Sequence, residues 1–182
     1  LDVATGTGDL AIALARRIRD VQVMGVDLSE EMLAVARRKV EARGLDSRIV
    51  LERGDAEHLE VADASVDAAT VAFGVRNFGD LAAGLRELAR TIRPGGKVVI
   101  LEFSRPRNRV FRALYEFYSY KILPRIGGLV SRDKRAYEYL PASVGEFPAP
   151  AEFLGMMEKA GFRNCRAKSQ SCGIAQIYIG ER

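Results

Sequence analysis

Short apolar runs alternate along the chain with longer segments in which apolar residues recur at helical spacing. The short runs, rich in Val, Ile and Leu, predict strands at residues 1–4, 21–26, 48–53, 66–73 and 97–103. The longer segments predict helices at residues 9–19, 29–43 and 79–92. Because strands that are separated by helices pair in parallel, this order predicts an α/β fold with helices on both faces of a mostly parallel sheet.

The pattern changes after residue 103. It then predicts a helix with an aromatic face at residues 108–126 and a second helix at 151–160. Two strands joined by a turn are predicted at residues 162–169 and 174–179. We therefore expect one domain over residues 1–182, built on a seven-stranded sheet that ends in an antiparallel hairpin, with residues 105–150 as a helical lid between the fifth and sixth strands. Because the first strand begins at Leu1 with no methionine before it, we also expect that an N-terminal region of the full protein is missing.

Composition narrows the class of protein. Hydrophobic residues make up 48% and charged residues 29% of the 182 residues, which is the balance of a folded globular domain. No apolar run reaches the roughly 18 residues of a membrane-spanning helix. The two cysteines fit a reducing compartment, so we expect a cytoplasmic protein. His58 is the single histidine, which argues against a histidine-based metal cluster or a Ser-His-Asp triad, and we expect no metal.

The positive charge is concentrated in one segment. The net charge is +4, and residues 105–135 hold nine basic residues against Glu116 and Asp133. Such a segment fits an anionic membrane surface, a nucleic acid or simply a solvated helix face. We expect peripheral contact with an anionic membrane surface at the inner face of the membrane, and no nucleic-acid partner.

A glycine loop follows the first predicted strand, in the run Leu-Asp-Val-Ala-Thr-Gly-Thr-Gly. Gly6 and Gly8 lack a Cβ, so the backbone can turn sharply there and approach a ligand closely. Asp27 stands at the end of the second strand, where a carboxylate accepts hydrogen bonds from ribose hydroxyls. The loop and the acid predict a nucleoside cofactor, but the same spacing also fits the dinucleotide fingerprint of an NAD(P)-dependent oxidoreductase.

Three features favour S-adenosylmethionine over NAD. Asp2 puts a carboxylate beside the loop, which would repel a pyrophosphate and attract the ammonium of a methionine moiety. Asp55 and Ala56 end the third strand, where a carboxylate can accept from the adenine amino group. The turn at residues 93–97 resembles the one before the fifth strand of class I methyltransferases. The alternative for Asp2 is a structural carboxylate that loop amides satisfy.

Several motifs resemble those of the ubiquinone/menaquinone biosynthesis C-methyltransferases. They are Phe73-Gly74-Val75-Arg76-Asn77, Arg90-Thr91-Ile92-Arg93-Pro94-Gly95-Gly96-Lys97, Tyr118-Ser119-Tyr120-Lys121-Ile122-Leu123-Pro124 and Tyr137-Glu138-Tyr139-Leu140-Pro141. The resemblance covers nearly all of the chain. It implies a Rossmann-like class I methyltransferase fold, S-adenosylmethionine as cofactor, and methyl transfer to a ring carbon of a polyprenylated quinol, either a naphthoquinol, a benzoquinol or both.

The resemblance also implies roles for single residues. Cofactor contacts fall on Thr7, Asp27, Asp55 and Ala56, and on Ala72, where the family often has a serine, so that only a backbone contact is left there. Tyr118 lies on the aromatic face of the predicted lid helix, where it either contacts the quinol or packs in the core. The resemblance implies that the substrate also meets Tyr137 and Tyr139 in the lid.

Two residues at the end of the fourth strand are the candidates for catalysis. We expect Arg76 to stabilise the phenolate form of the quinol and Asn77 to fix its ring. The alternative for Arg76 is an ion pair with a nearby carboxylate such as Glu102. A non-enzymatic alternative for the whole chain is a methyltransferase-fold module that binds cofactor or RNA without catalysis.

Overall fold

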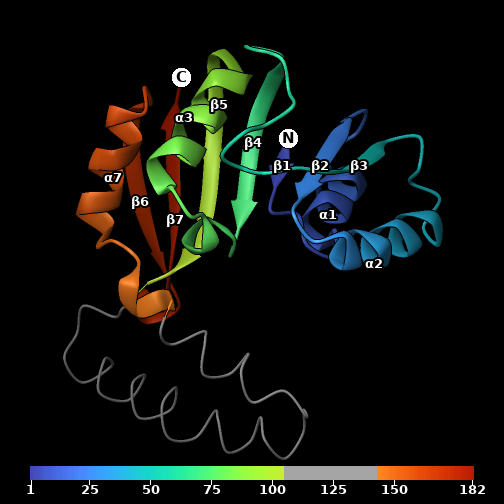
Figure 1. Ribbon diagram of the computed structural model, residues 1–182, viewed down its shortest axis with the longest axis horizontal. Coiled ribbons are helices and arrows are strands. Elements are labelled where there is room, and N and C mark those ends of the chain that lie inside the picture. The colour runs from blue at the N-terminus through green and yellow to red at the C-terminus, as the bar shows by residue number, and fades with distance from the viewer. Residues whose placement is uncertain (105–142) are drawn as a thin grey trace, which may run out of the picture.

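The computed structural model of the protein describes residues 1–104 and 143–182, and the lid predicted at 105–150 lies mostly outside them. Seven strands form one sheet in the order β3-β2-β1-β4-β5-β7-β6 (Figure 1). They are β1 (Asp2–Val3), β2 (Val23–Asp27), β3 (Ile49–Arg53), β4 (Val66–Ala72), β5 (Ile92–Phe103), β6 (Arg163–Gln170) and β7 (Ala175–Glu181). The first five pair in parallel, whereas β7 runs antiparallel to both β5 and β6. The predicted α/β fold class with its antiparallel C-terminal hairpin is confirmed.

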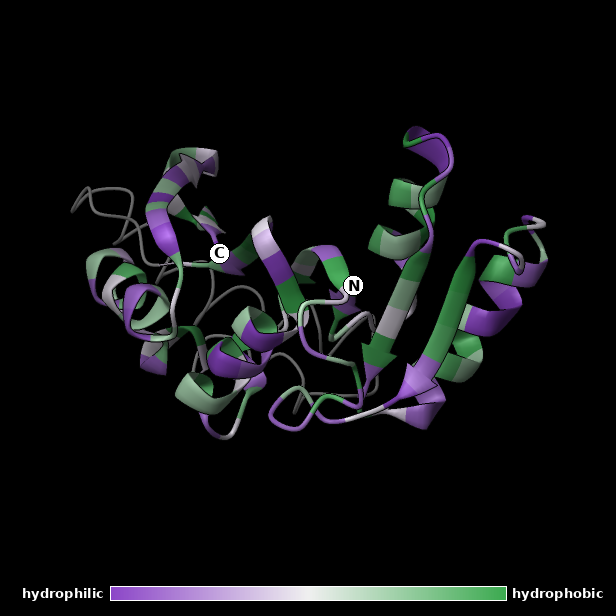
Figure 2. Ribbon diagram, turned by 90° about the horizontal axis from the view of Figure 1, so that it is seen from above, coloured by the Kyte–Doolittle hydropathy of each residue, from purple (hydrophilic) through white to green (hydrophobic). Residues whose placement is uncertain are grey.

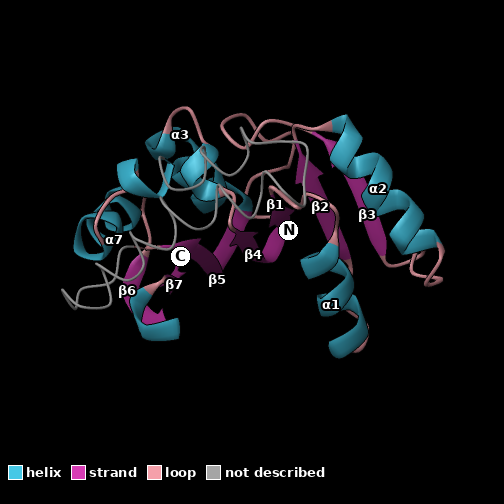
Figure 3. Ribbon diagram, turned by 90° about the horizontal axis from the view of Figure 1, so that it is seen from below, coloured by secondary structure: helices cyan, strands magenta, loops and turns pink. Residues whose placement is uncertain are grey.

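Helices cover both faces of the sheet. The described helices are α1 (Asp9–Arg17), α2 (Glu30–Glu41), α3 (Leu81–Thr91) and α7 (Pro150–Lys159), with single 3-10 turns at Val75–Asn77 and Ser171–Gly173. Figure 3 shows α3 and α7 together on one side of the sheet and α1 on the other. Figure 2 shows that the helices carry both hydrophobic and hydrophilic residues, as helices that pack with one face on a sheet must. None of the helices in the described ranges is long and apolar enough to cross a bilayer.

Polar side chains set where two helices begin. The Ser29 hydroxyl accepts a hydrogen bond from the Met32 amide at 3.3 Å at the start of α2, and the Asp80 carboxylate accepts one from the Ala83 amide at 2.9 Å at the start of α3. Each satisfies an amide that has no partner within its helix. Gly44 follows α2 with a φ of +62°, the left-handed conformation that ends many helices.

One strand begins well before its predicted start. The fifth strand was expected at 97–103, but β5 begins at Ile92, because this buried residue already pairs with Val66 of β4. The register then shifts between Val66 and Ala68, and Gly95 takes a φ of +80°. The predicted turn at 93–97 is therefore an irregularity within the β4–β5 pairing.

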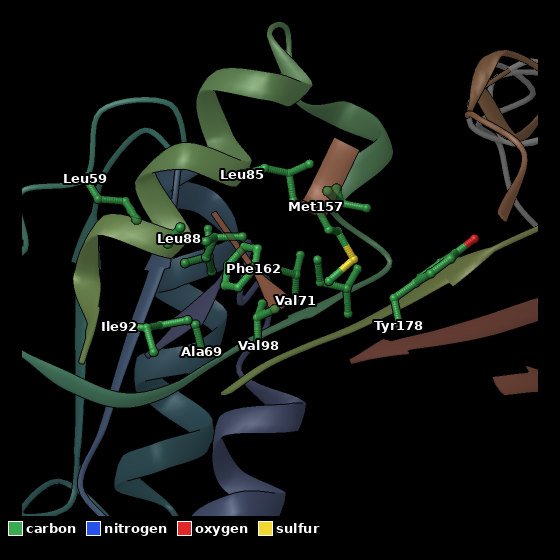
Figure 4. Packing of buried hydrophobic residues seen from close by; sticks show 14 of the residues in the cluster. Leu59, Ala69, Val71, Leu85, Leu88, Ile92, Val98, Met157, Phe162 and Tyr178 are labelled. Atoms are coloured by element: carbon green, nitrogen blue, oxygen red, sulfur yellow. The ribbon is translucent and has the colours of Figure 1, made fainter. Parts of the chain in front are cut away.

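The main core lies between the sheet and the helices α3 and α7. Figure 4 shows Leu85 and Leu88 of α3 beside Met157 of α7, packed against strand residues that include Val98 and Tyr178, and all five are fully buried. Fully burying a side chain of this size stabilises the fold by about 1.5–3 kcal/mol. This layer holds the central strands rigidly, so that their carboxyl ends can present a site.

Candidate functional site

A cavity of about 700 Å³ opens at the carboxyl ends of β1, β2, β3 and β4. It lies where the strand order reverses, since β1 has β2 on one side and β4 on the other, and open parallel sheets bind ligands at such a point. Eight of the predicted site residues line it: Asp2, Gly6, Thr7, Asp27, Asp55, Ala56, Ala72 and Asn77. Gly8 and Arg76 are not among the lining residues.

The two loop glycines have different roles. Gly6 has a φ of +56°, and a Cβ built on it would meet no atom within 4 Å, so its backbone is open to the cavity. Gly8 has a φ of +77° and caps α1, and a Cβ there would lie 3.0 Å from the Cβ of Ala36 in α2. Gly8 therefore lets α2 pack against the loop, whereas Gly6 leaves room for a ligand.

Asp27 ties the glycine loop to the end of β2. Its Oδ2 accepts a hydrogen bond from the Gly6 amide at 2.7 Å, and its Oδ1 accepts one from the Ser29 amide at 2.9 Å. A carboxylate offers about four acceptor positions, so two amides leave capacity for ribose hydroxyls. The predicted carboxylate is thus held rigidly at the cavity wall.

Asp2 is a buried carboxylate that neutral groups hold. It is 1% exposed, and its oxygens accept hydrogen bonds from the hydroxyls of Thr5 and Thr70, each at 2.6 Å. The alternative given for Asp2 was a structural carboxylate that accepts from loop amides, whereas the partners observed here are hydroxyls. Burial raises the pKa of Asp2, and the charge of Asp27 adds to this rise, although the two hydroxyl hydrogen bonds and the positive charge of the Leu1 amino group oppose it. A cationic ligand group would stabilise its charged form.

Part of the cavity lining is apolar, and sequence reasoning partly missed it. Leu28 and Met32 line it and are 64% and 47% exposed. Met32 follows the apolar spacing of α2 but is exposed, because the first turn of this helix borders the cavity. For Leu28 the available signal was its position directly after Asp27, at the end of a strand. These side chains offer a surface on which a flat ring can pack.

Glu57 joins two walls of the cavity and was not predicted. Its Oε1 accepts hydrogen bonds from the amides of Gly79 at 2.6 Å and Asp80 at 2.9 Å, next to the start of α3. Its own amide donates to Asp55 Oδ1 at 2.9 Å. The loop after β3 is thereby fixed to the loop after β4, although the two are more than 20 residues apart in the sequence.

Arg76 forms the ion pair with Glu102 that was the alternative to a catalytic role. Its Nη1 lies 3.0 Å from Oε1 of Glu102, and its backbone amide donates to Oε2 of the same carboxylate at 3.1 Å. The guanidinium also donates to the Phe73 carbonyl and to Oγ of Ser143, the latter at 3.3 Å, and lies 5.6 Å from the centre of the Phe103 ring. These contacts fasten the end of β4 to the end of β5 and to Ser143, the first residue of the second described range.

The remaining predictions lie elsewhere. Tyr118, Tyr137 and Tyr139 fall outside the described residues, as does the basic segment 105–135. Within the two described ranges, no group of three or more His, Cys, Asp or Glu residues is arranged to hold a metal ion.

The residues that line the cavity fit S-adenosylmethionine. Small-molecule sites have volumes of about 300–1,000 Å³ and combine an apolar lining with a few fixed polar groups. Here Asp27 and Asp55 stand at strand ends and Leu28 and Met32 provide the apolar wall. The carboxylates of Asp2 and Asp27 beside the loop favour a cationic ligand and would repel a pyrophosphate.

Comparison with solved structures agrees with this fold. A SAM-dependent methyltransferase from Aquifex aeolicus superposes with a TM-score of 0.72 at 20% sequence identity, covering 100% of this chain and 80% of that one. At this identity the likeness shows the fold alone.

Comparison with curated sequences shows closer relationships. The chain is 48% identical to the ubiquinone/menaquinone biosynthesis C-methyltransferase UbiE of Geobacter sulfurreducens, over 100% of this chain and 71% of that protein. It is 47% identical to the demethylmenaquinone methyltransferase of Thermus thermophilus, over 100% of this chain and 81% of that protein. The family match extends over residues 1–182. With its cavity at the switch point of the sheet and a family match that covers all of its residues, the chain belongs to the ubiE/COQ5 methyltransferase family.

Proposed function

We propose that this protein is an S-adenosylmethionine-dependent C-methyltransferase that methylates a ring carbon of a polyprenylated quinol in menaquinone or ubiquinone biosynthesis. The observation that carries this proposal is identity of 47–48% along the whole chain to proteins named for these reactions. The cavity supports it independently, because its carboxylates and apolar wall suit a cationic nucleoside. The family match favours methyl transfer over an NAD(P)-dependent oxidoreductase and over a module that binds RNA without catalysis.

The cavity divides into two ends for the cofactor. Asp27 is the acceptor for the ribose hydroxyls, and Asp55 with Ala56 takes the adenine edge, while Leu28 packs on the flat face of the ring. At the other end, Asp2 accepts from the ammonium of the amino-acid moiety, beside Gly6, Thr7 and the backbone of Ala72. When bound, the cofactor supplies an electrophilic methyl group on its sulfonium.

The chain's own contribution to catalysis is alignment and charge stabilisation. A quinol ring carbon becomes nucleophilic when a neighbouring hydroxyl gives its proton to water. After methylation that carbon releases its own proton to water and the ring oxygen takes one back, so that one proton is lost overall. Holding the ring carbon in line and stabilising the phenolate lower the barrier. Asn77 lines the cavity and is the residue we assign to the ring oxygen. Contact of Arg76 with the phenolate stays a prediction, since its guanidinium is engaged by Glu102 and Ser143.

We also propose that the basic segment 105–135 brings the protein to the anionic membrane surface where its isoprenoid substrate resides. Flotation with vesicles tests this. Binding to vesicles that contain phosphatidylglycerol, and not to neutral phosphatidylcholine vesicles, is the expected result. Equal behaviour with both would remove the proposal.

The proposed function is tested with the full-length protein, labelled S-adenosylmethionine and demethylmenaquinol. Label should appear in the quinol fraction, and an Asp27→Ala variant should abolish this transfer because the ribose loses its acceptor. Calorimetric titration with S-adenosylhomocysteine and with NADH separates the cofactor classes. Binding of NADH alone, or cofactor binding without transfer to any quinol, would overturn the proposal.

A further inference from the structure

The glycine loop is held from outside the cavity by a lysine on α2. The Nζ of Lys39 lies 2.8 Å from Oγ1 of Thr7, and 2.9 and 2.8 Å from the two carboxylate oxygens of Asp9. Thr7 and Asp9 line the cavity, whereas Lys39 does not. Its three N–H donors thus match three acceptors on the loop and the first turn of α1.

This arrangement fixes what the Thr7 hydroxyl can do. The hydroxyl donates its one proton to Oδ2 of Asp9 at 2.8 Å, and it accepts from Lys39. A hydroxyl has one donor and two acceptor positions, so one acceptor position is left. Thr7 therefore meets a ligand as an acceptor, which suits an ammonium and does not suit a carboxylate.

The same contacts contribute little to folding on their own. The Asp9 side chain is 74% exposed and that of Lys39 is 29% exposed, and exposed ion pairs add little to stability. The hydrogen bond from Lys39 lowers the pKa of Asp9, and that from Thr7 lowers it further, so Asp9 remains the ionised partner at neutral pH. The effect of the cluster therefore falls on the loop, where a ligand's position is decided.

We propose that Lys39 is a positioning residue of the cofactor site, which acts through Thr7 and Asp9 to hold the Thr7 hydroxyl as an acceptor for the amino-acid end of S-adenosylmethionine. This inference rests on the proposed function, and it adds a residue of α2 that makes no contact with the cavity. It predicts a loss of affinity confined to one end of the cofactor.

Two ligands separate that end from the rest. S-adenosylhomocysteine carries the amino-acid moiety, whereas 5′-methylthioadenosine keeps the adenosine and lacks the moiety. Lys39→Met removes the charge and its donors but keeps the length of the side chain. Calorimetric titration should show that S-adenosylhomocysteine binds about tenfold more weakly, because a change of this size corresponds to the loss of one charge-assisted hydrogen bond. The binding of methylthioadenosine should not change. Lys39→Arg, which keeps charge and donors, should recover most of the affinity.

Two further comparisons test the route of the effect. Arg37→Met removes a cation from the same helix, where Arg37 pairs with Glu30 instead of the loop, and should bind both ligands as the wild type does. In a Thr7→Val background, Lys39→Met should weaken the binding of S-adenosylhomocysteine little further, because the hydroxyl that Lys39 orients is already gone.

The outcomes are distinct. Equal weakening for both ligands, no weakening at all, or full additivity with Thr7→Val would overturn the inference while leaving the proposed function intact. Wild-type protein that fails to bind S-adenosylhomocysteine would instead overturn the proposed function. Thermal unfolding of each variant without ligand should stay close to the wild type, which separates lost positioning from lost folding.

Discussion

Two carboxylates at the carboxyl side of the sheet are equally buried but differently held. Asp2 in β1 is 1% exposed and Glu102 in β5 is 0% exposed. Asp2 accepts from the hydroxyls of Thr5 and Thr70, which carry no charge. Glu102 instead faces the guanidinium of Arg76, and its Oε1 also accepts from the Phe103 amide at 2.8 Å.

The difference separates a binding group from a structural one. A buried charge costs free energy unless it is paired, so Glu102 is compensated within the fold. Hydroxyls satisfy the geometry of Asp2 without compensating its charge, and its pKa is raised by burial accordingly. A ligand cation gains most at such a carboxylate. We therefore expect Asp2 to affect binding and the pair of Arg76 and Glu102 to affect stability.

The largest effect should come from breaking the ion pair. Arg76→Met leaves Glu102 buried without its cation, and removing one partner of a buried pair costs about 3–5 kcal/mol of unfolding free energy. Urea unfolding measures this. Arg86→Met, the same substitution at an exposed position of α3, is the matched control and should change stability little.

The same variant decides between the two roles of Arg76. If Arg76→Met unfolds at the wild-type urea concentration yet loses methyl transfer with cofactor binding intact, Arg76 contacts the substrate and is not a structural group. A loss of stability that Glu102→Gln in the same chain partly restores would place the effect in the pair.

The next effect concerns Asp2. Asp2→Asn keeps the shape but removes the charge, and a hydrogen bond to a charged group is worth about 1.5–3 kcal/mol. We expect S-adenosylhomocysteine to bind about 10- to 100-fold more weakly by calorimetry. Folding without ligand should be preserved at neutral pH, because no buried charge remains to be desolvated. Unchanged affinity would make Asp2 as structural as Glu102.

The pH dependence of stability sharpens this point with a smaller effect. The pKa of Asp2 is raised in the folded protein above its ordinary value of 3.8, so between these two values the folded form binds more protons than the unfolded chain. Unfolding free energy should then fall as pH rises through this window. Measured against Asp2→Asn at each pH, the wild type should lose stability on going from acid towards neutral pH. The opposite slope would mean that Asp2 is charge-compensated.

The smallest effect is expected at Glu57, which is partly exposed and accepts from backbone amides. Glu57→Gln keeps an oxygen for the amides of Gly79 and Asp80 but loses the negative charge beside the start of α3. Charges at helix starts are worth about 0.3–1 kcal/mol. Chemical unfolding in low salt should show a decrease of this size, and added salt should reduce it. A loss as large as that of Arg76→Met would show that the link between the two loops is itself essential.

Local signals predicted the frame of the site well. The alternation of strands and helices indicated that the strands pair in parallel, and the carboxyl ends of parallel strands share one edge of the sheet. Asp2, Asp27 and Asp55 were therefore expected near one another, and all three line the cavity. The cap at Ser29 is a local feature of the same kind, because its hydroxyl accepts a hydrogen bond from an amide only three residues away.

Contacts between distant segments were beyond the same reasoning. Arg76 and Glu102 are 26 residues apart, so spacing left their pairing as an alternative to catalysis. Lys39 reaches Thr7 across 32 residues, and its contact depends on how α2 packs beside the loop, which Gly8 and Ala36 determine. Helical periodicity identified the apolar face of α2 but not the fact that its first turn borders a cavity.

The position of β1 has a consequence for protein synthesis. Its two residues pair with β2 on one side and with Thr70 and Val71 of β4 on the other, 68 residues further along the chain. A ribosome has therefore already produced the glycine loop, Asp27 and Asp55 before the strand that encloses them emerges. A nascent chain arrested before residue 66 should carry the main nucleoside-binding side chains yet retain no cofactor, because the pocket closes only when β4 pairs with β1.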